Sequence, residues 1–356
     1  MVSLYRPAVK TILGRLFKIA ALTAGFFLVW WFISASDFGR IGDQLGHVGY
    51  KFAVLLLVTF CAQLLITRAL QLSFIDTPAL SLLRLFSIRL MGESLAQVNP
   101  TSFVAGETMK AVMLSRRGVP YNRSISALTI ARLTLWLSSI TLFCLGALLF
   151  LDRLDFAGNR VLMTLLAGGL FTGGLFFVRQ ISRSLPFFSL FAMILRRLLP
   201  WVRSLIIVER KLHKVDGDLS FFYHHRRREF ARAYALSLLH WLGGATEFFL
   251  ILWFLGVEVS FFSCIAMEVG VMLFKGLGTF VPGQIGIEEY ANRLMLDLVG
   301  VPGAELWISV SILRRTRQLF WIGMGTLLFS VTMMRRRRTA PLSTPVETYG
   351  NPVHHS

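Results

Sequence analysis

Long apolar runs constrain this chain more than any other feature of its sequence. A run such as the one from about Ile19 to Ser36 carries no charged side chain, and as a helix it is long enough to cross roughly 30 Å of hydrocarbon at about 1.5 Å per residue. Hydrocarbon offers the backbone no hydrogen-bond partner, so such runs are expected to be helical. Runs of this kind predict six full transmembrane helices, at about Ile19 to Ser36, Phe52 to Phe74, Leu133 to Leu151, Val161 to Val178, Ala233 to Val257 and Leu306 to Met334.

Composition supports this interpretation and argues against a nucleic-acid partner. Of the 356 residues, 55% are hydrophobic and only 16% are charged, which is typical of polytopic membrane proteins. The net charge of +18 comes from Lys and Arg at the ends of apolar segments, where inserted helices keep cytoplasmic charge. The cysteines, Cys61, Cys144 and Cys264, lie in separate apolar runs, so neither a disulfide framework nor a metal site is predicted. No cofactor is expected.

Two further apolar segments are each interrupted near the middle by a proline. These are Leu85 to Leu114, broken at Pro100, and Phe261 to Val299, broken at Pro282. Proline removes a backbone donor, and the polar groups that it frees must be sheltered in protein or a wet cavity. Three of the four arms are about 14 residues long, roughly 21 Å as helix, and are too short to cross. We therefore predict two re-entrant hairpins. The arm from Phe261 to Val281 is long enough to span, so two full crossings stay open as an alternative.

The two interruptions repeat one arrangement. The interval from Pro100 to Glu107 equals that from Pro282 to Glu289, and paired interruptions in the two halves of a chain indicate a transporter-type site. The predicted fold is an all-α integral membrane protein with six full transmembrane helices and two re-entrant hairpins in an inverted repeat.

The distribution of basic residues predicts the orientation. About 25 of the 37 Lys and Arg fall in segments that this layout places in the cytoplasm, and about 4 fall on the other side. Both termini are therefore expected inside. Residues 1–338 form one transmembrane domain in this layout, 179–232 form a cytoplasmic interfacial segment, and 339–356 form a disordered tail. The run from Phe187 to Val208 is predicted to be one amphipathic interfacial helix. Its arginines either attract anionic headgroups or, as we favour, simply set the topology.

Charged residues within the apolar segments are the candidates for chemistry. An unpaired charge at the membrane centre costs about 2.5 to 3.5 kcal/mol, so these groups must pair with one another or line water. Glu289 and Arg293 have the spacing of a helix-surface pair. Fifteen such groups are present: Arg68, Arg89, Arg132, Lys275, Arg293, Arg314, Arg315, Arg317, Glu93, Glu107, Glu247, Glu268, Glu288, Glu289 and Asp297.

The hairpin tips favour an anionic ligand. Thr101 or Ser102 is placed to cap the helix that carries Glu107, and another helix begins after Gly283, so two helix N-termini with partial positive charge would face a shared cavity. Arg132 and the late arginines Arg314, Arg315 and Arg317 are candidate phosphate donors, with Glu107 and Glu288 orienting them or exchanging protons.

At these residues the chain resembles the flippase-like transmembrane region of bacterial lysylphosphatidylglycerol synthases and their stand-alone relatives. The first family motif is matched by Pro100, Gly106, Glu107 and Lys110, with Arg116, Gly118 and Arg132 after it, and the second by Pro282, Gly283, Gly286 and Glu288 or Glu289, followed by Arg314 or Arg315. Gln284 replaces a usual Gly and Lys110 a commoner Arg, which puts the headgroup preference in doubt. The residues expected to bind a lipid headgroup or to line the cavity are Pro100, Gly106, Glu107, Lys110, Arg132, Pro282, Gly283, Gly286, Glu288, Glu289, Arg314 and Arg315.

The resemblance implies lipid handling without synthesis, since the family's soluble aminoacyltransferase domain is not in this sequence. We therefore expect a non-enzymatic lipid translocator of the bacterial inner membrane, with a membrane lipid as its partner. Two alternatives stay open. One is a non-catalytic partner of a separate lipid-modifying enzyme. The other is a lipid-linked transferase that uses Asp216 and Asp218, which lie in a turn-like Asp-Gly-Asp sequence. The particular lipid, the direction of transport and the oligomeric state are not predicted.

Overall fold

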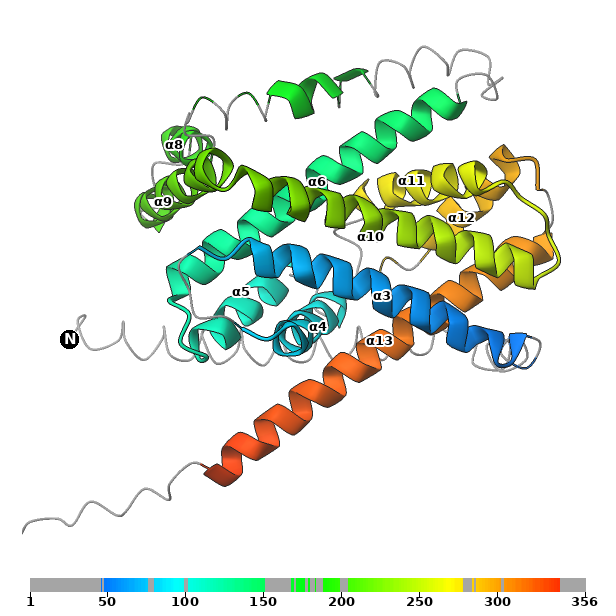
Figure 1. The fold of residues 1–356 in the computed structure, drawn as a ribbon, viewed down its shortest axis with the longest axis horizontal. Helices are drawn as coiled ribbons and strands as arrows, with labels where there is room; N and C mark the ends of the chain where they lie inside the picture. Colours follow the sequence, from blue (N-terminus) through cyan, green and yellow to red (C-terminus); the bar gives the residue numbers. More distant parts are fainter. Residues whose placement is uncertain are drawn as a thin grey trace, which may run out of the picture.

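The computed structural model describes residues 46, 48–75, 80–98, 102–150, 188–198, 204–277, 284, 286–301 and 304–339, with short pieces between 168 and 183. The regular structure of this part of the chain is helical (Figure 1). The helices are α3 (Lys51–Leu72), α4 (Leu82–Val98), α5 (Ser102–Ser115), α6 (Tyr121–Phe150), α8 (Phe188–Leu198), α9 (Ser204–His225), α10 (Arg227–Phe254), α11 (Phe261–Leu277), α12 (Ile287–Leu298) and α13 (Ala304–Thr339).

Three helices of the described part are long and apolar enough to cross a membrane. They are α3, α6 and α10, and they correspond to the second, third and fifth predicted runs. α13 covers the sixth run as one continuous helix of 36 residues, but it carries seven arginines and is not among those three helices. The first predicted run lies outside the described residues, and most of the fourth does too. The all-helical membrane class is therefore confirmed, whereas the count of six spans stays a prediction.

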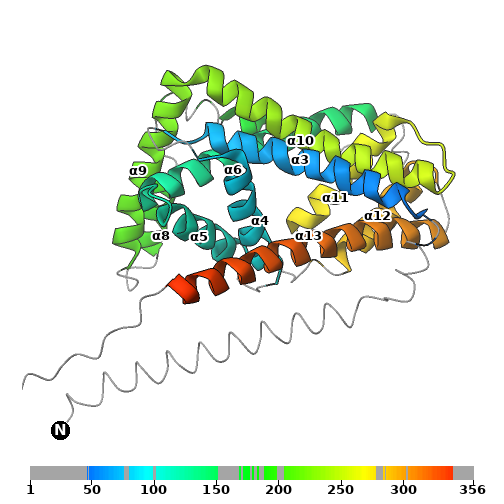
Figure 2. The same cartoon turned by 60° about the horizontal axis from the view of Figure 1, so that its bottom comes forward.

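The two interrupted segments fold as helix pairs whose breaks include the predicted prolines. α4 ends at Val98 and α5 begins at Ser102, while α11 ends at Leu277 and α12 begins at Ile287. Within each pair the two helices pack against each other. Figures 1 and 2 show the two pairs toward opposite ends of the molecule. Pro100, Pro282 and Gly283 lie outside the described residues.

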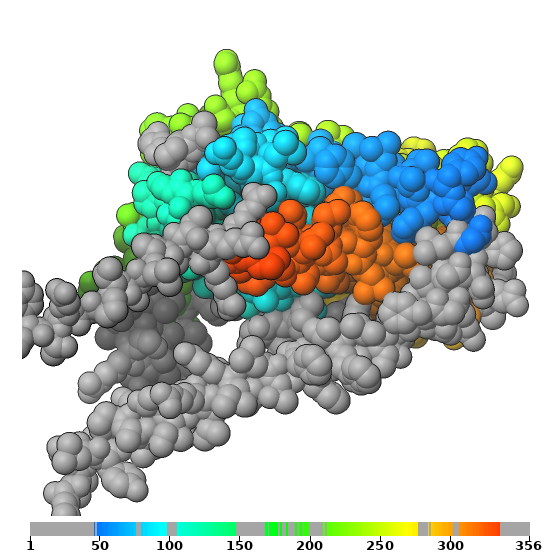
Figure 3. Space-filling view, turned by 90° about the horizontal axis from the view of Figure 1, so that it is seen from below, coloured from blue at the N-terminus to red at the C-terminus, as the bar shows by residue number. Residues whose placement is uncertain are grey.

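The remaining helices hold these pairs in place. α3 and α10 run side by side along the length of the molecule (Figures 1 and 2), and α10 also packs against α6 and α11. α13 packs against both α4 and α12, and so connects the two pairs. From below, α13 covers one face beside α3 (Figure 3). The largest apolar core joins Phe248 and Ile251 of α10 to Met267 of α11 and Leu313 of α13.

The single helix predicted from Phe187 to Val208 is wrong. The structure has two helices there, α8 and α9, which end and begin at Leu198 and Ser204 and pack against each other. Pro200 lies in the intervening sequence, and a proline disfavours helical backbone at the residue before it.

Candidate functional site

The first group of charged side chains, called here the α5 cluster, joins three helices. It consists of Arg89 and Glu93 of α4, Glu107 and Lys110 of α5, and Arg132 of α6. Lys110 Nζ lies 3.0 Å from Glu107 Oε1 and 3.8 Å from Glu93 Oε1. Arg89 Nη1 donates to Glu93 Oε1 at 2.6 Å, and Arg132 donates to Glu107. Each carboxylate therefore contacts two cations.

Two glycines allow this cluster to form. A Cβ atom added to Gly106 would lie 2.6 Å from the carbonyl oxygen of Gly92, and one added to Gly92 would lie 2.5 Å from Cγ of Lys110. Real Cβ atoms do not approach other atoms so closely. The glycines therefore let α4 and α5 touch backbone to backbone, and the stem of Lys110 lies over Gly92.

The α5 cluster lines a cavity of about 210 Å³. The cluster places three cations against two carboxylates around this space, so its formal charge favours an anion. Gln63 and His240 complete the polar wall, and the apolar wall consists of Ile66, Leu70, Leu128, Ala131 and Leu135.

Gln63 and His240 were not found from the sequence. His240 Nδ1 lies 2.9 Å from the carbonyl oxygen of Ala62, and because a carbonyl only accepts, Nδ1 carries a proton. Gln63 accepts from Arg89 through both its backbone and its side-chain oxygen. The available signal was weak, since each is an uncharged polar residue within an apolar helix.

The second group, called here the α13 cluster, is centred on Arg314. The Arg314 side chain is 3% exposed and lies between two carboxylates, with Nε 3.2 Å from Glu288 Oε1 and Nη2 3.1 Å from Glu268 Oε2. Its guanidinium stacks 4.0 Å from the centroid of the Phe248 ring. Glu288 also accepts from Lys275 Nζ at 3.1 Å. The full cluster is Glu247, Glu268, Lys275, Glu288, Glu289, Arg314, Arg315 and Arg317.

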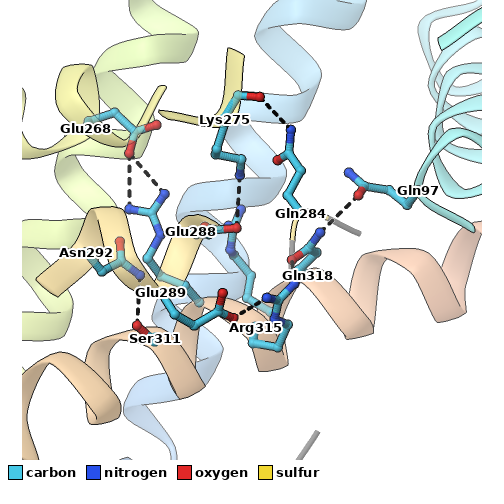
Figure 4. A network of polar contacts seen from close by, with 12 residues as sticks. Gln97, Glu268, Lys275, Gln284, Glu288, Glu289, Asn292, Ser311, Arg315 and Gln318 are labelled. Atoms are coloured by element: carbon cyan, nitrogen blue, oxygen red, sulfur yellow. Dashed lines mark hydrogen bonds and ion pairs between the residues drawn. The ribbon is translucent and has the colours of Figure 1, made fainter. Parts of the chain in front are cut away.

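The rest of the α13 cluster ties α12 and α13 to their neighbours (Figure 4). Arg315 donates to Glu289, whose second oxygen accepts from the backbone N–H of Gly286 at 2.8 Å. Arg317 Nε lies 2.7 Å from Glu247 Oε1 on α10. The predicted pair of Glu289 with Arg293 is therefore wrong, because Arg293 instead lies 5.9 Å from the centroid of the Trp307 ring. The cluster holds four cations and four carboxylates, so its formal charge is balanced.

Gln284, which stands where the resembled family commonly has Gly, adopts a left-handed backbone with φ of +52°. Glycine adopts this conformation without steric cost, and other residues do not. The Gln284 side chain donates to the carbonyl oxygen of Lys275 at 2.9 Å (Figure 4). That carbonyl belongs to the last turn of α11, where intrahelical donors run out, so the amide supplies a bond that Gly lacks.

The structure distributes the predicted site residues between the two clusters. Glu107, Lys110 and Arg132 belong to the first, and Gly106 lies beside it at the contact of α4 with α5. Glu288, Glu289, Arg314 and Arg315 belong to the second, and the backbone of Gly286 donates to Glu289. Between the helices that carry the two clusters, Gln318 of α13 donates to Gln97 of α4 at 3.1 Å (Figure 4). Gln318 also accepts from Arg315, whereas Gln97 lies two turns beyond Arg89 on α4.

The Asp216 and Asp218 carboxylates do not converge. Residues two apart on a helix point to nearly opposite faces. Asp216 Oδ2 accepts from the backbone N–H of Ser189 at 2.8 Å, whereas Asp218 accepts from Ser126 Oγ at 2.6 Å and from Arg123 Nη1 at 3.2 Å. The two aspartates fasten α9 to two different helices, α8 and α6, and this geometry gives no support to a paired metal site.

A comparison with known protein families shows to which family the chain belongs. A family model described as the lysylphosphatidylglycerol synthase TM region matches residues 17–325 of the chain. The chain belongs to this family. The match spans both clusters and confirms the resemblance seen in the motifs. The family indicates a membrane protein with a lipid-related role. No curated protein and no solved structure matches the chain.

Proposed function

We propose that this protein moves a lipid with an anionic or phosphate headgroup between the leaflets of the bacterial inner membrane. The headgroup passes through the cavity of the α5 cluster while the hydrocarbon chains stay in the bilayer, and no covalent chemistry takes place. The observation that carries the proposal is the cavity of about 210 Å³, which has an excess of one cation in its wall and is set among apolar helices.

The side chains of the α5 cluster differ in exposure, and in this proposal they have different roles. Arg89 and Lys110 have side chains 7% and 6% exposed, whereas those of Arg132 and Glu107 are 31% and 22% exposed. The two buried cations supply a fixed positive field. Arg132 is the reachable cation, and its planar guanidinium suits a phosphate oxygen pair. Glu107 holds Arg132 in place until a headgroup arrives.

The α13 cluster takes a structural part in this proposal. Its charges are balanced, and Arg314 is enclosed by two carboxylates and an aromatic ring. In the proposed orientation, with both termini in the cytoplasm, the α4–α5 hairpin enters the membrane from the cytoplasmic side and the α11–α12 hairpin from the other side.

Reconstitution into liposomes tests the proposal. Fluorescent phosphatidylglycerol, phosphatidylcholine and diacylglycerol are followed as they cross the bilayer, and the protein is expected to accelerate the lipids that carry phosphate. Replacing Arg132 by Ala removes a charge-assisted contact, which corresponds to a loss of about tenfold or more in rate. Glu107→Gln is expected to slow transport similarly because Arg132 loses its positioning partner.

The matched control is Arg68→Ala. Arg68 is an exposed arginine on α3 that donates to its helix neighbour Gln71, and it does not line the cavity. Its loss is expected to leave the rate unchanged. Transbilayer rates equal to those of protein-free vesicles would overturn transport. Equal losses of transport rate in Arg68→Ala and Arg132→Ala would overturn the assignment of the α5 cluster as the headgroup site.

A further inference from the structure

The two faces of α8 differ in polarity, and the exposed face carries the apolar stripe. On the face of α8 toward α9, Ser189 donates its hydroxyl to Asp216 Oδ2 at 2.7 Å, and Arg196 pairs with Glu209 at 3.1 Å. On the opposite face, Leu190, Ile194 and Leu198 are 41%, 47% and 67% exposed. These three residues recur every fourth position and form one apolar stripe. An exposed apolar stripe of this kind on a helix fits a lipid environment.

The exposed charges of this hairpin are positive. Each acidic side chain of α8 and α9 is engaged by the protein, Glu209 with Arg196, Asp216 with Ser189, and Asp218 with Arg123 and Ser126. By contrast, Arg197, Arg210 and Lys214 are exposed. Arg210 and Lys214 are four residues apart and share one face of α9. The hairpin therefore presents cations beside an apolar stripe, which matches the two parts of an anionic lipid.

A pocket lies where the cations meet the stripe. It has a volume of about 460 Å³ and shares no lining residue with the cavity of the α5 cluster. Leu190 and Met193 line its apolar side, and the polar side consists of Ser189, Arg196, Glu209, Arg210 and His213. Ser189 Oγ lies 3.4 Å from His213 Nδ1, which holds the imidazole at the pocket wall.

We infer that the α8–α9 hairpin binds an anionic phospholipid of the surrounding bilayer at this pocket. The phosphate lies against Arg210 and His213, with Lys214 one turn further along, and an acyl chain follows Leu190, Ile194 and Leu198. Arg196 is already neutralised by Glu209, so Arg210 and Lys214 supply the net charge. The site is separate from the proposed transport cavity, so this inference does not depend on the proposed transport function.

Native mass spectrometry of the full-length protein, released from nanodiscs that contain equal phosphatidylglycerol and phosphatidylcholine, tests the inference. The wild type is expected to retain phosphatidylglycerol preferentially. The Arg210→Ala/Lys214→Ala variant is expected to lose roughly 25-fold in apparent affinity, at about fivefold for each basic residue near the surface. The control Arg227→Ala/Arg228→Ala removes the same charge from exposed positions at the start of α10 and is expected to retain the lipid.

A second variant tests the apolar half of the site. Ile194→Asn/Leu198→Asn alters exposed side chains only, so folding is expected to be unaffected, and retention of phosphatidylglycerol is expected to fall. Equal retention in wild type and Arg210→Ala/Lys214→Ala would overturn the inference. Equal losses of phosphatidylglycerol retention in both charge variants would indicate a diffuse basic surface and would also overturn it. Equal retention of the two lipids by the wild type would overturn it as well.

Discussion

At the scale of single residues, Arg314 shows how a buried charge is held in an apolar environment. Its guanidinium contacts Glu268, Glu288 and the Phe248 ring. Replacing Arg314 by Met leaves two buried carboxylates short of their cation, and breaking a buried pair in this way costs about 3 to 5 kcal/mol. We expect a marked fall in the thermal unfolding temperature of the detergent-solubilised protein, measured by intrinsic fluorescence.

Arg293→Met is the control for this change, since Arg293 has an aromatic partner, Trp307, in place of the two carboxylates. It is expected to change stability by less than about 1 kcal/mol. Adding Glu268→Gln to Arg314→Met removes one of the stranded charges and is expected to restore part of the loss. An unfolding temperature unchanged in Arg314→Met would show that the carboxylates find water or other partners.

Charge pairing was only partly predictable at this scale. The cost of exposing charges to hydrocarbon predicts that they pair. It does not predict which residues pair with each other. Helical spacing suggested Glu289 with Arg293, whereas the structure pairs Glu289 with Arg315, 26 residues away. Local spacing cannot reveal a contact that depends on how α12 packs against α13.

At the scale of helices, the close approach of α4 and α5 is the feature most sensitive to substitution. A methyl group at Gly106 would lie 2.6 Å from the carbonyl oxygen of Gly92 and 2.8 Å from Cβ of Ala96. Both are parts of a helix that cannot move without shifting Glu93. Gly106→Ala is therefore expected to cost about 1 to 3 kcal/mol of stability and to slow lipid transport in the liposome assay.

Gly217→Ala is the matched control for this substitution. Gly217 lies in α9 with no atom within 4 Å of an added Cβ, and alanine favours helix over glycine by about 1 kcal/mol. Its unfolding temperature is expected to stay the same or rise. A Gly106→Ala protein as stable and active as the wild type would show that α4 and α5 do not need this contact.

Helix breaks were predictable where the sequence carries proline within an apolar run. The gaps from Val98 to Ser102 and from Leu277 to Ile287 include Pro100 and Pro282. The break between α8 and α9 was not predicted, because apolar and basic residues alternate across the whole run from Phe187 to Val208. The polar face of α8 is turned toward Asp216 and Glu209. The sequence alone does not show this, because these contacts depend on how α8 packs against α9.

At the scale of the whole molecule, the proposed orientation predicts which loops face each side of the membrane. Arg117 lies in the loop between α5 and α6, and Glu258 lies in the loop between α10 and α11; both are exposed. In a variant with Cys61, Cys144 and Cys264 replaced by Ala, a membrane-impermeant maleimide is expected to label Glu258→Cys in intact spheroplasts. It is expected to label Arg117→Cys only after permeabilisation. The reverse pattern would overturn the orientation.

The same assay separates a re-entrant hairpin from two full crossings. α4 has 17 residues and α5 has 14, about 25 and 21 Å as helices, against roughly 30 Å of hydrocarbon. Gln97 lies near the end of α4 and contacts Gln318 within α13. If the hairpin turns back inside the membrane, Gln97→Cys stays unlabelled from outside at times when Glu258→Cys is complete. Labelling of the two positions at equal rates would mean that α4 crosses fully, and the inverted arrangement of the hairpins would then fail.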